Sequence, residues 1–157
     1  MRLSIRKGFS FGLTSGVITT LGLIVGLHSS THSAPVIIGG ILVIAIADAC
    51  SDALGIHISE EYENKHTTRE IWEATVTTFL SKFIVTLTFI IPVLLFPLYT
   101  AITLNVIWGL SLMAVFSFYM AREQGASPYL VVVEHLAIAV FVIIVTHYVG
   151  DWVATLS

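Results

Sequence analysis

Apolar residues along this chain are grouped in five long blocks, separated by short segments that hold most of the charged residues. Each block has about 20 residues or more, enough for a helix to cross the roughly 30 Å hydrocarbon layer of a membrane. The pattern predicts five transmembrane helices, at about residues 9–27, 35–63, 75–96, 99–120 and 128–150. Ser33 and Pro35 suit the start of the second helix, as a capping hydroxyl and a first-turn proline. The expected fold is an all-α polytopic membrane protein.

The composition supports this class and excludes several others. Of the 157 residues, 56% are hydrophobic and 11% are charged, and the mean hydropathy is +0.94, which no ordinary water-soluble domain reaches. The single cysteine excludes an intrachain disulfide framework. A formal net charge of -3 provides no basic surface for nucleic acid. The longest polar segment, roughly residues 60–73, is too short for its own core, so we expect one domain over residues 1–157.

The distribution of the 7 basic residues orients the predicted helices. They precede the first helix, lie between the second and third or just inside the third, or lie between the fourth and fifth: Arg2, Arg6, Lys7, Lys65, Arg69, Lys82 and Arg122. Basic residues stay on the cytoplasmic side. We therefore expect a cytoplasmic N-terminus and an outer C-terminus, as an odd number of crossings requires. We expect an integral, multi-pass membrane protein, located in the cell membrane if the source is prokaryotic.

Two acidic residues, Asp48 and Asp52, lie inside the second apolar block. Counting about 1.5 Å per residue from Pro35 places them roughly 20 and 26 Å deep. A carboxylate at such depth is costly and is usually kept for a function. Because the two are four residues apart, they share one helical face, and hard oxygen ligands of this kind favour Mg²⁺, Mn²⁺ or Fe²⁺. The alternative is structural: acids that are protonated or paired with a base, although the single charge of Lys82 cannot neutralise both.

Other candidate residues surround this pair. Small residues form a stripe on one face of each of the first two helices, and these stripes predict close packing of the two. The stripes consist of Gly12, Ser15, Thr19, Gly22 and Gly26 on the first helix and of Ala45, Gly55 and Ser59 beside the acids on the second. Ser15, Thr19 and Ser59 are further candidate oxygen ligands. Glu134, roughly 9 Å into the fifth helix, could share a layer with Asp52. Five acids at the inner end of the second and third helices would either concentrate cations or simply form a solvated loop: Glu60, Glu61, Glu63, Glu70 and Glu73.

Histidines and the cysteine have more ordinary interpretations. His28 and His32 are spaced like a helical metal pair, but the short outer loop does not guarantee that geometry. A packing or interface role is the preferred interpretation for Cys50 and His57, which lie on the face opposite the acids.

The first two helices resemble the vacuolar iron transporter family. The resemblance rests on GFSFGLTSGVITTLGLIVGL (residues 8–27) and on SDALGIHIS (residues 51–59), together with five helices and an inner N-terminus. It implies a homodimer with the ion path between the first two helices of both subunits, and export of Fe²⁺ or Mn²⁺ from the cytoplasm in exchange for protons. Ser15 stands where the family has an acid, Asp52 where it has methionine and Ile56 where it has glutamate. The family's soluble metal-binding helices are missing.

Three functions follow from these observations. The first is a homodimeric transporter of divalent metal, bound in transit and not as a permanent cofactor, with Asp48 and Asp52 as ligands and proton carriers. The second is a non-transporting membrane scaffold or partner-binding protein that keeps the same fold. An intramembrane enzyme is the third and least favoured, because acids of an aspartyl dyad usually lie on different helices where they share one proton. We therefore expect no enzymatic activity.

Overall fold

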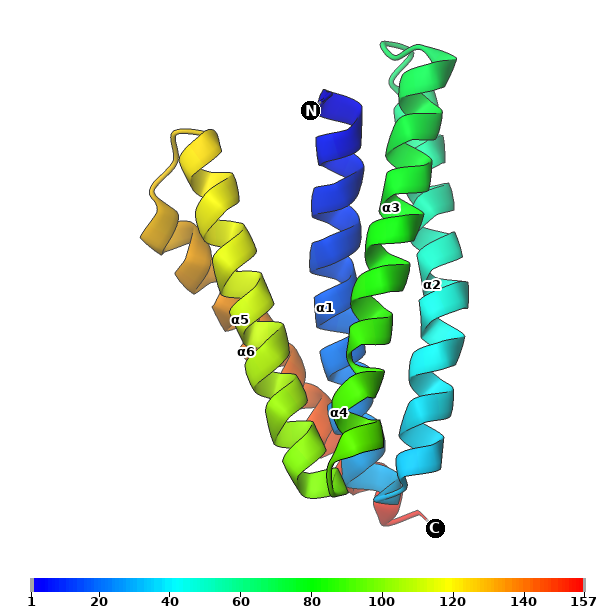
Figure 1. The fold of residues 1–157 in the computed structure, drawn as a ribbon, viewed down its shortest axis with the longest axis vertical. Helices are drawn as coiled ribbons and strands as arrows, with labels where there is room; N and C mark the ends of the chain where they lie inside the picture. The colour runs from blue at the N-terminus through cyan, green and yellow to red at the C-terminus, as the bar shows by residue number, and fades with distance from the viewer. Residues whose placement is uncertain (1, 157) are drawn as a thin grey trace.

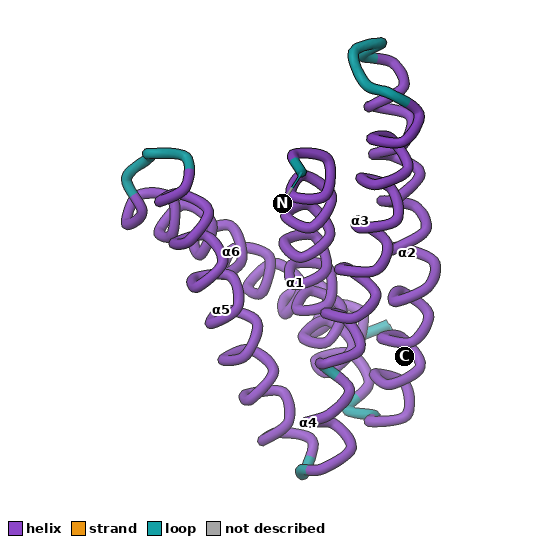
Figure 2. Tube along the Cα trace, turned by 45° about the horizontal axis from the view of Figure 1, so that its top comes forward, coloured by secondary structure: helices purple, strands orange, loops and turns teal. Residues whose placement is uncertain are grey.

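The computed structural model describes residues 2–156, and within them all regular secondary structure is helical, with no strand. Six helices follow one another in the chain: α1 (Leu3–Thr31), α2 (Ala34–Tyr62), α3 (Thr68–Thr88), α4 (Ile90–Leu95), α5 (Leu98–Glu123) and α6 (Pro128–Ala154). α3 and α4 together form one crossing, so these helices make five spans long and apolar enough to cross a membrane. This confirms the all-α, multi-pass prediction. Short loops join the helices at the two ends of the bundle (Figure 2).

The helix ends differ from the expected positions for identifiable reasons. Ser33 is the N-cap of α2, and Pro35 lies in its first turn, but the Ser33 side chain makes no capping hydrogen bond. α3 begins at Thr68, about two turns before the expected residue 75. Its start is a capping box, in which Thr67 and Glu70 bond each other's backbone N–H groups.

The third crossing is interrupted at Phe89, between α3 and α4. Pro92 explains the break, because proline has no N–H for the carbonyl of Thr88 and its ring crowds that carbonyl. Two side chains of α5 support the interruption. Asn105 Nδ2 donates to the carbonyl of Phe89 at 3.1 Å, and Trp108 Nε1 donates to Thr88 Oγ1 at 3.0 Å.

α1 is the centre of the bundle and contacts α2, α3, α5 and α6 (Figure 1). The two termini lie at opposite ends, and we name these the N-terminal end and the C-terminal end (Figure 1). The α2–α3 and α5–α6 connections lie at the N-terminal end (Figure 1). Apolar side chains of α1, α2, α4 and α5, together with Phe89, form the buried core, which includes Leu21, Ile24, Ile37, Ile41, Phe89, Val93, Ala101 and Ile102.

α1 and α3 run in the same direction and meet in a fixed register. Four residues of α1 at four-residue spacing face five of α3: Gly8 faces Ala74, Gly12 faces Thr78 and Ser81, Gly16 faces Lys82, and Thr20 bonds Thr86. A Cβ at Gly8 or Gly12 would overlap α3 backbone atoms. Glycine therefore permits the close approach, as small residues do between helices in lipid. Farther along, Gly22 and Gly26 face Thr146 of α6. The predicted small-residue stripe therefore contacts α3 and α6 through its glycines, and it reaches α2 through Ser15, which bonds Asp52.

We predict that Gly12→Ala lowers the stability of the bundle by about 1–3 kcal/mol, because its Cβ would meet the Thr78 carbonyl and Ser81 Oγ. Gly55→Ala is the matched control: it lies in an exposed part of α2 with nothing within 4 Å of the added Cβ. There the better helix propensity of alanine should leave stability unchanged or slightly raised. Thermal unfolding in detergent compares the two variants. Equal melting temperatures would contradict the close α1–α3 contact.

Candidate functional site

Lys82 of α3 lies between the two membrane-embedded carboxylates of α2. Its Nζ is 2.6 Å from Asp48 Oδ2 and 2.5 Å from Asp52 Oδ2. Ser15 of α1 completes the group: its hydroxyl donates to Asp52 Oδ2 at 2.6 Å and accepts from Lys82 Nζ at 2.9 Å. We call Ser15, Asp48, Asp52 and Lys82 the lysine–carboxylate cluster. It is assembled from three helices, and the glycine at position 16 leaves room for the Lys82 side chain.

The cluster is unevenly buried. The Lys82 side chain is 1% exposed, whereas those of Asp52 and Asp48 are 20% and 32% exposed. Each carboxylate uses Oδ2 for its ion pair, and Oδ1 of neither residue has a hydrogen-bond partner within residues 2–156. With all three groups ionised the cluster carries one net negative charge. At the exposed side chain of Asp48, the cluster therefore retains a net negative charge and carboxylate oxygen atoms without hydrogen-bond partners.

The structure separates the predicted oxygen ligands. Ser15 joins the cluster, but Thr19 directs its hydroxyl to the Ser15 carbonyl of its own helix at 2.9 Å. Ser59 is exposed, two turns beyond Asp52. Glu134 is exposed on α6, a helix that packs against α1 and α5, and it has no ion pair within the described chain. The sequence had indicated that Lys82 was unusual. Its contact with both acids was not predicted. This contact is the arrangement expected if the two acids have a structural role and are paired with a base.

The acids at the N-terminal end are mostly paired. Glu60 is buried, with 2% of its side chain exposed, and forms an ion pair with Lys7. His66 Nε2 lies 3.3 Å from Glu60 and 3.4 Å from Glu63. Glu73 accepts from Arg2, Ser4 and Arg69, while Glu70 belongs to the capping box.

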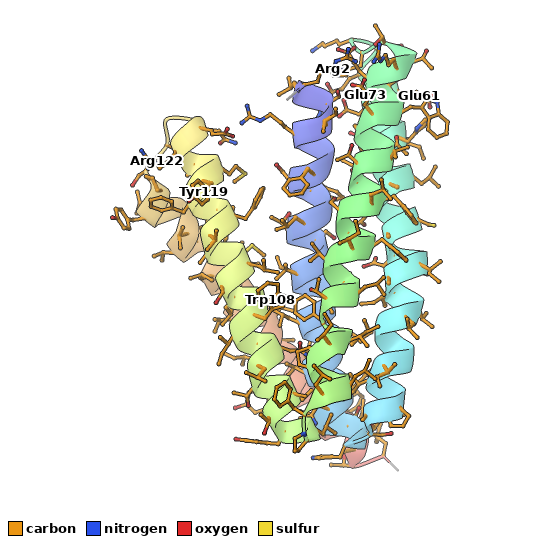
Figure 3. All side chains as sticks on the ribbon, in the orientation of Figure 1. Arg2, Glu61, Glu73, Trp108, Tyr119 and Arg122 are labelled. Atoms are coloured by element: carbon orange, nitrogen blue, oxygen red, sulfur yellow. The ribbon has the colours of Figure 1, made fainter. Side chains whose placement is uncertain are left out.

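Figure 3 shows the contrast between two of these acids at the N-terminal end. Glu73 lies beside Arg2, whereas the exposed Glu61 lies on the outer side of α2. These ion pairs connect the start of α1 to α2 and α3. Because most of the acids are paired, little unpaired negative charge remains at this end to concentrate cations.

A second polar cluster lies at the C-terminal end, where α1 meets α6. The rings of His28 and His32 are 5.0 Å apart. Ser29 Oγ is 2.5 Å from His147 Nδ1, and His147 Nε2 is 3.5 Å from Asp151. Within residues 2–156, however, no three His, Cys, Asp or Glu side chains are arranged to hold a metal ion. On the other face of α2, His57 bonds Thr75 at 2.9 Å and Cys50 is exposed.

Comparison with known proteins gives no family for this chain: no protein-family model matches it, and no curated protein matches its sequence.

We predict that Lys82→Met destabilises the protein by about 3–5 kcal/mol, because it leaves two carboxylates without their counter-charge. The triple variant Asp48→Asn, Asp52→Asn and Lys82→Met should recover most of the loss, since it removes the uncompensated charges together with the lysine. Thermal unfolding in detergent measures both. A triple variant no more stable than Lys82→Met would contradict the electrostatic origin of the effect.

Proposed function

We propose that this chain is a membrane transporter that exchanges a divalent cation for protons, with Asp48 and Asp52 as cation ligands and Lys82 as the group that competes with the cation. The observation that supports it is a buried lysine held by two carboxylates one helical turn apart on a spanning helix. An ammonium group there already occupies the position of a cation. Buried ionisable groups of this kind mark ion and proton pathways in membrane proteins.

Charge balance supports a divalent cargo. When Lys82 is protonated, the cluster has a net charge of -1, counting Asp48, Asp52 and Lys82 as ionised. When the cation displaces the Lys82 ammonium group from Asp48 and Asp52, one divalent cation neutralises their two negative charges. Binding of the cation and release of the proton would then be coupled, as metal binding generally is to deprotonation of its site.

The cluster also suits a particular class of ion. Ser15, Asp48 and Asp52 supply oxygen atoms only, and such ligands prefer Mg²⁺, Mn²⁺ and Fe²⁺ to soft metals. From the resemblance to vacuolar iron transporters we propose Fe²⁺ or Mn²⁺ as cargo and export from the cytoplasm. We also propose a homodimer, because Asp48 is one-third exposed on a helix whose neighbouring surface is apolar. A second copy covering it would complete the coordination.

A second candidate is a non-transporting scaffold or partner-binding protein with the same bundle. The specific observation in its favour is that Lys82 already pairs with one oxygen atom of each carboxylate. On this hypothesis the cluster only joins α1, α2 and α3.

Transport assays separate the two candidates. We expect proteoliposomes with the wild-type protein to take up Mn²⁺ when a proton gradient drives exchange, with a matching signal from a trapped pH indicator. In the double variant Asp48→Asn and Asp52→Asn, this Mn²⁺ flux should be about tenfold or more below that of the wild type. Glu134→Gln is the control, because it removes a membrane-embedded carboxylate outside the cluster. Equal fluxes in the double variant and the wild type would reject Asp48 and Asp52 as ligands.

A substitution of Lys82 tests its role separately. The ammonium group of Lys82 lies between the two carboxylates that we propose as ligands, so the cation must displace it. Lys82→Arg replaces it with a guanidinium group, which binds carboxylates through two parallel hydrogen bonds and is harder to displace. We therefore expect this variant to bind Mn²⁺ about tenfold or more weakly than the wild type. Binding is measured by isothermal titration in detergent; equal affinities would contradict the competition.

A further inference from the structure

Buried polar groups continue from Lys82 toward the C-terminal end. Thr86 lies one turn beyond Lys82 on the same face of α3, and its hydroxyl is 3.2 Å from that of Thr20 on α1. One turn farther, the Phe89 carbonyl accepts from Asn105 of α5. We call Lys82, Thr20, Thr86 and Asn105 the polar column. All four residues are fully buried at the centre of the bundle.

Hydroxyl groups alone would not indicate a path. Thr20 also bonds the Gly16 carbonyl of its own helix at 2.5 Å, which is ordinary behaviour for threonine in a membrane helix. Asn105 is different. Because the Phe89 carbonyl can only accept, the amide must present Nδ2 to it. Oδ1 is then buried without a hydrogen-bond partner among the described residues.

An unpaired carbonyl oxygen in the interior of a bundle is costly. Buried water commonly satisfies such groups. The neighbouring Phe89 carbonyl accepts one hydrogen bond from Asn105 and has a second lone pair. The region between α3, α4 and α5 therefore supplies polar partners for water at the level of Phe89.

We propose that the polar column is the proton route of this protein, running along the α1–α3 contact from the lysine–carboxylate cluster to a buried water at Asn105. The proposal rests on the proposed exchange function for what the route carries, and it places the route inside one subunit. The Phe89 level lies about 10 Å beyond Lys82 and about 9 Å from the end of the crossing at Leu95, at 1.5 Å per residue. Val93 and Ile102 pack at this end and close the route in the present conformation.

Cysteine labelling tests the route without relying on transport. In a Cys50→Ser background, which removes the one native thiol, Thr86→Cys and Asn105→Cys are treated in proteoliposomes with a small, permanently charged methanethiosulfonate. We expect each to react at least about tenfold faster than Ala101→Cys, since the reagent needs a hydrated thiolate. Ala101 is the matched control: it is fully buried on α5, one turn from Asn105, in apolar surroundings. Rates equal to that of Ala101→Cys would overturn the route.

Measurements of proton flux in proteoliposomes distinguish the proposed proton route from the proposed exchange function. Thr86→Val keeps the shape of the side chain and removes the hydroxyl, and we expect it to lower proton flux about tenfold or more while leaving the melting temperature nearly unchanged. Unchanged flux in Thr86→Val, with flux lost in the Asp48→Asn and Asp52→Asn variant, would overturn the route and retain the exchange function. Fast labelling at Thr86 and Asn105 without any exchange in the wild type would retain the hydrated route and reject the exchange function.

Discussion

The ion pair of Lys82 with Asp48 and Asp52 is the interaction on which the arrangement of the first three helices depends. Neither carboxylate could remain ionised at its depth in a membrane without Lys82, and Lys82 needs at least one of the two. The Lys82 side chain reaches the acids because α1 has a glycine, Gly16, where the lysine passes. Close packing of α1 against α3 and the electrostatics of the cluster are therefore one constraint. A larger residue at Gly12 or Gly16 would disturb both.

Much of the fold is predictable from the sequence because membrane helices must satisfy their backbone within one continuous apolar segment. The length and spacing of the apolar blocks gave five crossings. The start of α3 was missed because residues 60–73 were treated as a polar loop, although Thr67 and Glu70 have capping-box spacing. The interruption at Phe89 was not predicted, although Pro92 lies inside the expected third helix, and the hydrogen bond from Asn105 that supports it comes from another helix.

The candidate site was predictable only in part. Four-residue spacing placed Asp48 and Asp52 on one face, and Ser15 was identified as a nearby oxygen. Their pairing with Lys82 depends on which helices meet α1, and periodicity does not contain that information. The small-residue stripe of α1 illustrates this limit: Gly12 faces α3, Ser15 bonds Asp52 of α2, and Gly22 and Gly26 face α6. A central helix contacts different neighbours along its length, so one stripe need not form one interface.

The number of acids in the cluster bears on its purpose. A purely structural ion pair for Lys82 needs one carboxylate, and a second one leaves a net negative charge whose desolvation is unfavourable in a membrane. Asparagine at position 48 would fill similar space without this cost. The extra acid is also the more exposed of the two, at 32% against 20%. An excess carboxylate beside a partly open surface is expected where a cation or a proton must enter and leave, and it favours exchange over a scaffold role.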